Sequence, residues 1–520
     1  MAPTVALSLF ALLGAGGLAF DYARLASLDT ELQNAADQAA LAAATQLDQQ
    51  PRAMQRAVAA AQGLLTNQTL IAAGLGRNVT IPTVVFYATK ADAENNTNPI
   101  TNVALFASAR FVRVAVGARR ADYALTPIIG AITSGDIGAE AVAGLGAAIC
   151  KTPPVMICNP AETSTNLTFD ANALRGAGLR LVSVGGGNGG WAPGNFGYLD
   201  TSGGSNGAPG LREALGWNTP PGDCIAQSGV DTKPGATVTV TDALNTRFDI
   251  FDSNVACPAG GACGASINSV KDVVRPANAN GGNMCRLHTQ GWQEVAAGLQ
   301  YLPTSPTTAL ATTVTPGAMG HPRDMCHAVD SGVTGACTGP IGNGLWDRDA
   351  YFRTHYRKAE GGYWQSGTGA GTWRGNTGLP ANATRYEVYR WEYENRGTVV
   401  DGVNVLGPNP ASATGSTNVA YGSPQCSAAE GYAPVVPSAT VPDRRRISVA
   451  VVNCVAQSVN GAVDNLPVVK WIDVFLVQPS LNRARTSAGD VYAEVIGETQ
   501  TGAGATAGQV VRRDIPYLVK

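Results

Sequence analysis

The sequence predicts an α+β protein with a long N-terminal helix, a small sheet and a β-rich head stapled by disulfides. Residues 2–20 carry no charged side chain, and neither Pro nor Gly occurs between Gly17 and Asp48. All ten cysteines and all eight tryptophans lie at or after Cys150. Large aromatic side chains dominate core energetics, so the main core is expected there. The expected parts are residues 1–50, an anchoring and assembly helix; 51–149, a helix with a small sheet; and 150–520, the head.

The N-terminal helix combines two patterns. Its first part is apolar over about the 20 residues needed to cross a bilayer. Its second part is amphipathic, with apolar residues at helical spacing, so one rod of roughly 65–70 Å is expected. Small residues let apolar helices approach closely, which favours packing against copies of the same helix. The residues expected to carry this packing are Val5, Leu9, Leu12, Leu13, Gly14, Gly17, Phe20, Leu25, Leu28, Leu32, Ala36, Ala39 and Ala43.

Two other interpretations of this segment stay open. A buried core helix is disfavoured by the length of the apolar run at a chain end. A cleaved secretory signal would use Leu18-Ala19 as its processing site, but no Lys or Arg precedes the apolar run. We therefore expect the segment to remain in the mature protein, with a short leader removed before Met1.

Two stretches resemble a known family. Residues 14–22, followed by L-Q-N-A-A-D-Q-A-A-L-A-A-A at residues 32–44, resemble the N-terminal signature of TadE/TadG-like Flp (Tad) pilus-assembly proteins. Residues 444–454 and 471–477 resemble the C-terminal part of TadG-related proteins. The resemblance implies a pilin-like anchoring helix, partnership with other Tad pilus components, and a route through the inner membrane and periplasm to the cell surface.

The chain departs from the family in two places. Many TadG proteins carry a von Willebrand A domain with a D-x-S-x-S metal motif, but the nearest string here, residues 249–254, has the wrong spacing. A metal-dependent adhesion domain is therefore not expected. Family pilins have an acidic residue near the mature N-terminus, where this chain has Val5.

Composition narrows the class of protein. Charged residues make up 14%, below the roughly 25% of ordinary soluble domains, while Gly (62) and Pro (30) are abundant. This balance favours short strands joined by tight loops on an exterior surface. With 36 basic and 38 acidic residues the net charge is −2, which gives no electrostatic footprint for nucleic acid.

The even number of cysteines behind an apolar segment predicts a disulfide framework formed outside the cytoplasm. Short sequence separations favour five bonds and no free thiol. The expected pairs are Cys150–Cys158, Cys224–Cys285, Cys257–Cys263, Cys326–Cys337 and Cys426–Cys454. The rival interpretation is a zinc site, since Cys326 lies between His321 and His327.

The remaining elements follow from local patterns. A second helix is expected over residues 52–65 after Pro51, strands over 79–87 and 109–116, and a short helical link within 121–149. Head strands are expected at residues 237–240, 247–251, 447–452, 468–477 and 490–496. Acidic and amide residues near residues 185–210 and at Asp249 and Asp252 leave a structural calcium open, although no calcium-binding loop motif occurs.

Three functions remain open. We expect a filament or Tad-type pilus subunit that assembles through its N-terminal helix, or a single-copy anchored assembly factor. An adhesin is the third, because the aromatic tract from Trp346 to Tyr393 is either a sugar-binding face or packed core. No enzyme is expected, because no histidine lies in a nucleophile–base or zinc-hydrolase motif. The four histidines are His288, His321, His327 and His355.

Overall fold

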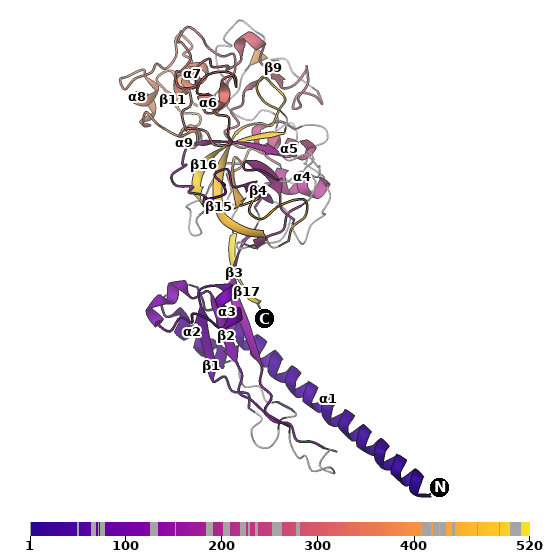
Figure 1. Ribbon diagram of the computed structural model, residues 1–520. Helices are drawn as coiled ribbons and strands as arrows, with labels where there is room; N and C mark the ends of the chain where they lie inside the picture. The colour runs from indigo at the N-terminus through magenta and orange to yellow at the C-terminus, as the bar shows by residue number, and fades with distance from the viewer. Residues whose placement is uncertain are drawn as a thin grey trace. The chain divides into compact units, whose positions relative to one another are not determined.

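The computed structural model places the chain in two compact units, residues 1–148 with 513–520 and residues 149–512 (Figure 1). We call them the first unit and the head, and describe each by itself. The described residues are 2–48, 51–63, 69–70, 72, 78–124, 134–150, 152–183, 191–200, 208–218, 225–226, 229–233, 238–251, 263–276, 281–407, 418–419, 426, 433–438, 443–464, 466–487, 489–499 and 511–519. Residues 185–190, Cys224, Asp252 and Cys257 of the sequence predictions lie outside them.

The first unit packs helix α1 (Ala2–Ala44) against a four-stranded path of sheet. The path runs β1 (Thr83–Tyr87), β2 (Phe111–Ala115), β3 (Glu140–Cys150) and β17 (Val511–Leu518). Its other helices are α2 (Ala53–Gly63), α3 (Lys90–Asn95) and the 3₁₀ helix η1 (Val103–Ser108). The predicted second helix and the two predicted strands are confirmed, each shorter than expected.

Strand β3 corrects the helical link expected within residues 121–149. Ala141 and Ala143 face the core beneath α1, while Val142 packs on the other side of the sheet with Tyr87. This two-residue alternation is typical of a strand. The sequence does not reveal this alternation, because most residues of β3 are alanine or glycine and few large apolar side chains mark the two faces of the strand.

The last strand returns to the first unit from the far end of the chain. The Val519 N–H donates to the Val142 carbonyl (2.7 Å), and a side chain at Gly144 would meet the Tyr517 ring. Residue 519 therefore lies at residue 142 and residue 517 lies at residue 144. Because the residue numbers fall along one strand as they rise along the other, β17 and β3 run antiparallel. Continued along both strands, this register sets residue 149 opposite residue 512, the two boundaries of the head. The head is therefore inserted at the tip of a β-hairpin, whereas the sequence assigned residues 513–520 to the head itself.

The head is built on a closed sheet. Its order is β14 (Arg446–Val452), β4 (Val155–Cys158), β6 (Asn195–Tyr198), β5 (Gly178–Ser183), β16 (Asp490–Glu498) and β15 (Leu466–Gln478). Because β14 also pairs with β15, these six strands close into a barrel, and β8 (Gly229–Val230) adds to β15. Alternate residues of these strands line the largest buried cluster. The predicted strands 447–452, 468–477 and 490–496 are confirmed as β14, β15 and β16.

The rest of the head consists of short elements. Helices are α4 (Ala208–Gly216), α5 (Val238–Asn245), α6 (Met325–Ala328), α7 (Arg348–His355), α8 (Trp373–Thr377) and α9 (Arg385–Glu394), with 3₁₀ turns η3 (Thr246–Phe248) and η4 (Ala297–Leu299). Short strands are β7 (Ile225–Ala226), β9 (Val273–Pro276), β10 (Gln293–Glu294), β11 (Val399–Val400), β12 (Val403–Asn404) and β13 (Asn418–Val419).

Two predicted head strands are wrong. Residues 238–240 begin helix α5, whose Val240, Ala243 and Leu244 reach the barrel core at helical spacing. Packing of this apolar face overrides the strand preference of the β-branched Val and Thr residues. Residues 247–251 contain the end of η3 and then turn at Asp249, whose φ is +66°.

Buried arginines join the barrel to the surrounding loops. Arg444 donates to the carbonyls of Gly216 and Trp217 (2.8 Å), and Arg247 donates to that of Leu215 (2.7 Å). These carbonyls close helix α4, where no intrahelical donor remains and the helix dipole favours a cation. The arginine run that resembles TadG-related proteins therefore has a structural role in this head.

Two disulfides are described in the head. Cys326 bonds Cys337, as predicted, and Cys158 bonds Cys454 across 296 residues. The predicted Cys150–Cys158 and Cys426–Cys454 pairs are therefore wrong, because the parallel pairing of β4 with β14 sets Cys158 beside the end of β14.

The other cysteine predictions have mixed outcomes. Cys426 is a buried free thiol, contrary to the expectation of none. Cys263 is disulfide-bonded, but its predicted partner Cys257 lies outside the described residues, as does Cys224, the predicted partner of Cys285.

Candidate assembly interface on the N-terminal helix

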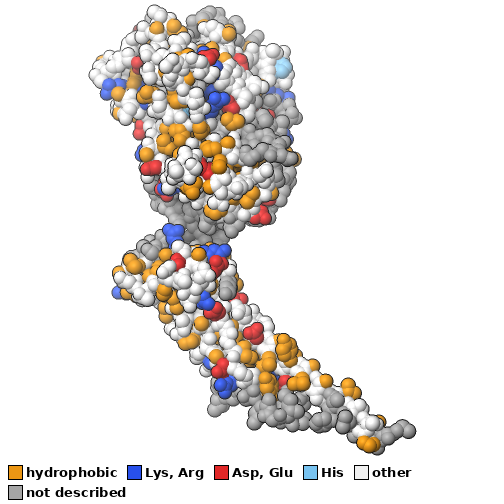
Figure 2. Space-filling model, in the orientation of Figure 1, with side chains coloured by type: hydrophobic (Ala, Val, Ile, Leu, Met, Phe, Trp, Pro, Cys, Tyr) orange, Lys and Arg blue, Asp and Glu red, His pale blue; other side chains and the backbone are white. Residues whose placement is uncertain are grey.

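Helix α1 divides into a packed part and a projecting part. From about residue 28 onward the helix lies on α2 and the sheet, and its N-terminal part extends past the sheet (Figure 1). Hydrophobic side chains gather along this projecting part in Figure 2. Of Ala2, Ala6, Leu7, Phe10, Ala11 and Leu13, only the helical backbone is described.

The packed part buries one stripe within the first unit itself. Leu28 and Leu32 are fully buried and belong to the same cluster as Met54, Val112 and Val114. The predicted assembly residues buried in this way are Leu28, Leu32, Ala36, Ala39 and Ala43, with Leu25 partly buried beside them. These side chains therefore hold the helix to its own sheet.

The projecting part presents a different stripe. Val5, Leu9, Leu12 and Phe20 are 60%, 58%, 71% and 50% exposed. Their spacing of four, three and eight residues keeps them on one face of the helix. At about 100° per residue, this face lies roughly 160° around the axis from the buried one. We call these four residues the exposed stripe.

Two glycines of the projecting part have open space beside them. A side chain added at Gly14 or Gly16 would meet no atom within 4 Å. Gly17, in contrast, is buried and lies on the packed face of the helix. The predicted pair Gly14 and Gly17 therefore does not mark the exposed stripe: Gly14 is open but lies about 160° around the axis from it, whereas Gly16 lies on it.

Asp21 fixes the junction between the two parts. Its side chain is only 2% exposed, and Oδ1 accepts a hydrogen bond from the Ala124 backbone N–H (2.7 Å). A carboxylate is rarely buried without such a partner. We did not predict this contact, although Asp21 is the first charged residue after the apolar run and so marked the position.

Among the described residues, no helix is both long and apolar enough to cross a membrane. The transmembrane segment expected over residues 2–20 is therefore not supported.

The aromatic tract of the head is mostly packed core. Trp346, Trp364 and Trp373 are at most 3% exposed and form one cluster with Tyr351 and Phe352. Phe352 and Trp373 stack with their ring planes 4° apart. Tyr389 is also fully buried, while Tyr386, Trp391 and Tyr393 are half-buried. These rings stabilise the head, and most of them offer no face to a sugar.

The zinc site and the structural calcium site that the sequence left open are not supported by the described residues. Cys326 is taken up by its disulfide, which removes the zinc ligand expected between His321 and His327. Asp249, named for calcium, accepts hydrogen bonds from the Cys426 N–H with both oxygens (3.1 and 3.0 Å). In the part of the chain that the structure describes, no group of three or more His, Cys, Asp or Glu residues could hold a metal ion.

Comparison with known proteins identifies a family match for the N-terminal segment. Residues 1–46 match the model of the family described as putative Flp pilus-assembly TadE/G-like. The resemblance predicted from residues 14–44 is thereby confirmed for this N-terminal segment. Neither the curated proteins nor the solved structures contain a match to this chain.

Proposed function

Because residues 1–46 are a TadE/G-like pilus-assembly segment, we propose that the protein is a structural subunit of a Tad-type surface filament. Copies pack through the exposed stripe of α1, and the head faces outward. The observation that carries the proposal is the stripe itself, four large apolar side chains at least half exposed on one helix face. The route includes the inner membrane and the periplasm, and no catalytic activity is assigned.

The energy available from the stripe supports this proposal. Burying a large apolar side chain contributes about 1.5–3 kcal/mol, and half or more of each side chain is still accessible. Complete burial of the four would therefore contribute roughly 4–7 kcal/mol for each helix.

The alternative function is a single anchored assembly factor, in which the same apolar part of α1 is held in a bilayer. The two functions differ in geometry. Packing against another copy uses one face, whereas lipid surrounds the helix. Leu18 separates them, because it is 54% exposed but lies on the side of the helix away from the stripe.

The experiment compares Leu12→Glu with Leu18→Glu in the full-length protein. After detergent removal, electron microscopy of the wild type and of Leu18→Glu should show ordered polymers, and Leu12→Glu should remain monomeric. Equal loss of assembly in both variants, or a wild type that yields only dispersed monomers, would overturn the subunit proposal. Flotation with lipid vesicles then tests the alternative function. An anchored assembly factor requires both variants to bind the vesicles less than the wild type does.

A further inference from the structure

A small cavity in the head borders the aromatic cluster, whose Tyr301 and Met319 form part of its wall. Its volume is about 60 Å³, room for a group of a few heavy atoms. Residues of strand β10, the 3₁₀ turn η4 region and the loop between β15 and β16 line it. Its charged residues are Arg323, Arg483, Arg485, Asp272 and Glu294.

Arg323 brings a buried positive charge without a directly paired carboxylate to the cavity wall. The side chain is buried (5% exposed) and donates to Gln478 Oε1 (2.9 Å), the Arg485 carbonyl (3.0 Å) and the Thr486 hydroxyl. All three acceptors are neutral. Among the described residues, no carboxylate oxygen lies within 4.0 Å of its nitrogens. Asp272 and Asp490 offset part of this charge without a direct contact, and burial still disfavours it, so an anion hydrogen-bonded to the guanidinium would be stabilising.

Arg485 adds a second guanidinium to the cavity, on an exposed side chain. Its Nη1 donates to the carbonyls of Ala328 (2.6 Å) and Pro303 (3.2 Å), which again are neutral acceptors. The residue has a φ of +62°, a conformation that costs free energy for a side chain other than glycine and that turns this loop at the cavity. No described carboxylate pairs with Arg485 within 4.0 Å either.

Arg483 completes the positive side of the cavity. Its Nη1 pairs with Asp272 Oδ1 (2.5 Å), so its charge is compensated, but its buried Nε has no hydrogen-bond partner. An unsatisfied buried donor carries a desolvation cost that a bound acceptor would remove. Three guanidinium groups face two carboxylates, of which Asp272 is already paired, so the cavity keeps an excess of donors.

We propose that this cavity binds the carboxylate group of a small anionic ligand, with Arg323 and Arg485 supplying the charge. A planar carboxylate matches the guanidinium donors in geometry, and its size suits the volume. Glu294 lines the same cavity and repels an anion, so it limits affinity and selects small or singly charged ligands. This inference does not depend on filament assembly.

The test uses ¹⁹F NMR titration of the full-length protein with trifluoroacetate, and trifluoroacetamide serves as the neutral probe of similar shape. Saturable binding of the acid and none of the amide is expected. Arg485→Gln should weaken binding about tenfold, the value of one charge-assisted hydrogen bond. Glu294→Gln should tighten binding about threefold, because a like charge is removed. Arg390→Gln, an exposed arginine outside the cavity, should change nothing.

Two results would overturn the proposal. The first is equal binding of acid and amide, or competition by chloride at equal concentration, because either shows no carboxylate recognition. The second is an affinity that neither Arg485→Gln nor Glu294→Gln alters. Thermal melting of each variant establishes that the head is folded, and the opposite signs expected for the two substitutions separate binding from a general loss of structure.

Discussion

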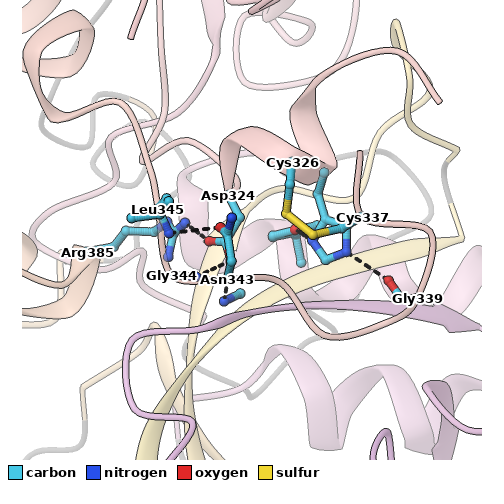
Figure 3. The surroundings of a disulfide bond; sticks show 11 residues. Asp324, Cys326, Cys337, Gly339, Asn343, Gly344, Leu345 and Arg385 are labelled. Carbon is cyan, nitrogen blue, oxygen red and sulfur yellow. Dashed lines mark hydrogen bonds and ion pairs between the residues drawn. A yellow bond between two sulfur atoms is a disulfide. The ribbon is translucent and has the colours of Figure 1, made fainter. Parts of the chain in front are cut away.

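Replacing Arg385 by methionine should destabilise the head by several kcal/mol. The guanidinium is fully buried and pairs with Glu494 (2.8 Å) and with Asp324 next to the Cys326–Cys337 disulfide (Figure 3). Glu494 in turn accepts the backbone N–H groups of Arg385 and Tyr386, so one side chain holds the start of α9 to β16. Removing one partner from a buried ion pair costs about 3–5 kcal/mol, because the remaining charges are uncompensated.

The loss in free energy of unfolding caused by Arg385→Met should depend on pH. Burial raises the pKa of Glu494, and Arg385 offsets part of that rise. Without the guanidinium the pKa of this carboxyl moves further upward, above its unfolded value. Such a group is stabilising in its protonated form at low pH, and this stability is lost as pH rises through the folded-state pKa. The difference between variant and wild type should therefore shrink as pH falls.

Urea unfolding followed by tryptophan fluorescence measures this difference, since all eight tryptophans belong to the head. Arg390→Met is the matched control on the same helix. Arg390 forms an exposed i,i+4 pair with Glu394, which solvent screens, so its loss should cost less than about 1 kcal/mol. Equal effects of the two substitutions, or a deficit for Arg385→Met that grows as pH falls, would refute the reasoning.

Leu28→Ala should destabilise the first unit by about 2–5 kcal/mol, because its side chain is fully buried, while Leu12→Ala should leave circular-dichroism melting unchanged. Burial lowers the pKa of His321 to about 4, below its value in the unfolded chain. The free energy of unfolding that depends on the neutral imidazole should therefore be lost as pH falls from about 6.5 towards 4. An imidazole NMR signal from His321 that titrates near 6.5 would contradict this prediction. Non-reducing peptide mapping should recover Cys326 linked to Cys337, and replacing both by serine should cost roughly 2–3 kcal/mol for this short loop, whereas mapping that joins either cysteine to another partner would contradict the fold.

The sequence predicted best the elements whose pattern is local. The apolar run with its small residues predicted helix α1, and the continuous Val and Ile runs near residues 447–452 and 468–477 predicted β14 and β15. In each case the period of the apolar residues and the local propensity agree. The 11-residue separation of Cys326 and Cys337 predicted their bond correctly, whereas the same argument failed for Cys150 and Cys158.

Long-range pairing could not be predicted in this way. The Cys158–Cys454 bond depends on the parallel pairing of β4 with β14, and sequence spacing carries no information about that neighbour. The same limit applies to the assembly helix. Leu12 and Leu28 belong to one apolar pattern, yet only the structure shows that Leu28 is buried against the sheet and Leu12 is left exposed.

The antiparallel register of β3 with β17 has a consequence for how such a protein can change. Since this register sets residue 149 opposite residue 512, a two-residue Asn-Gly turn could join the strands directly and keep the pairing of β3 with β17, with only the pairing of β7 with β3 lost. The chain thus enters and leaves the head at neighbouring residues, and heads of different length or chemistry can be exchanged there while the first unit keeps its own strands. Selection on the head is in this way uncoupled from selection on helix α1.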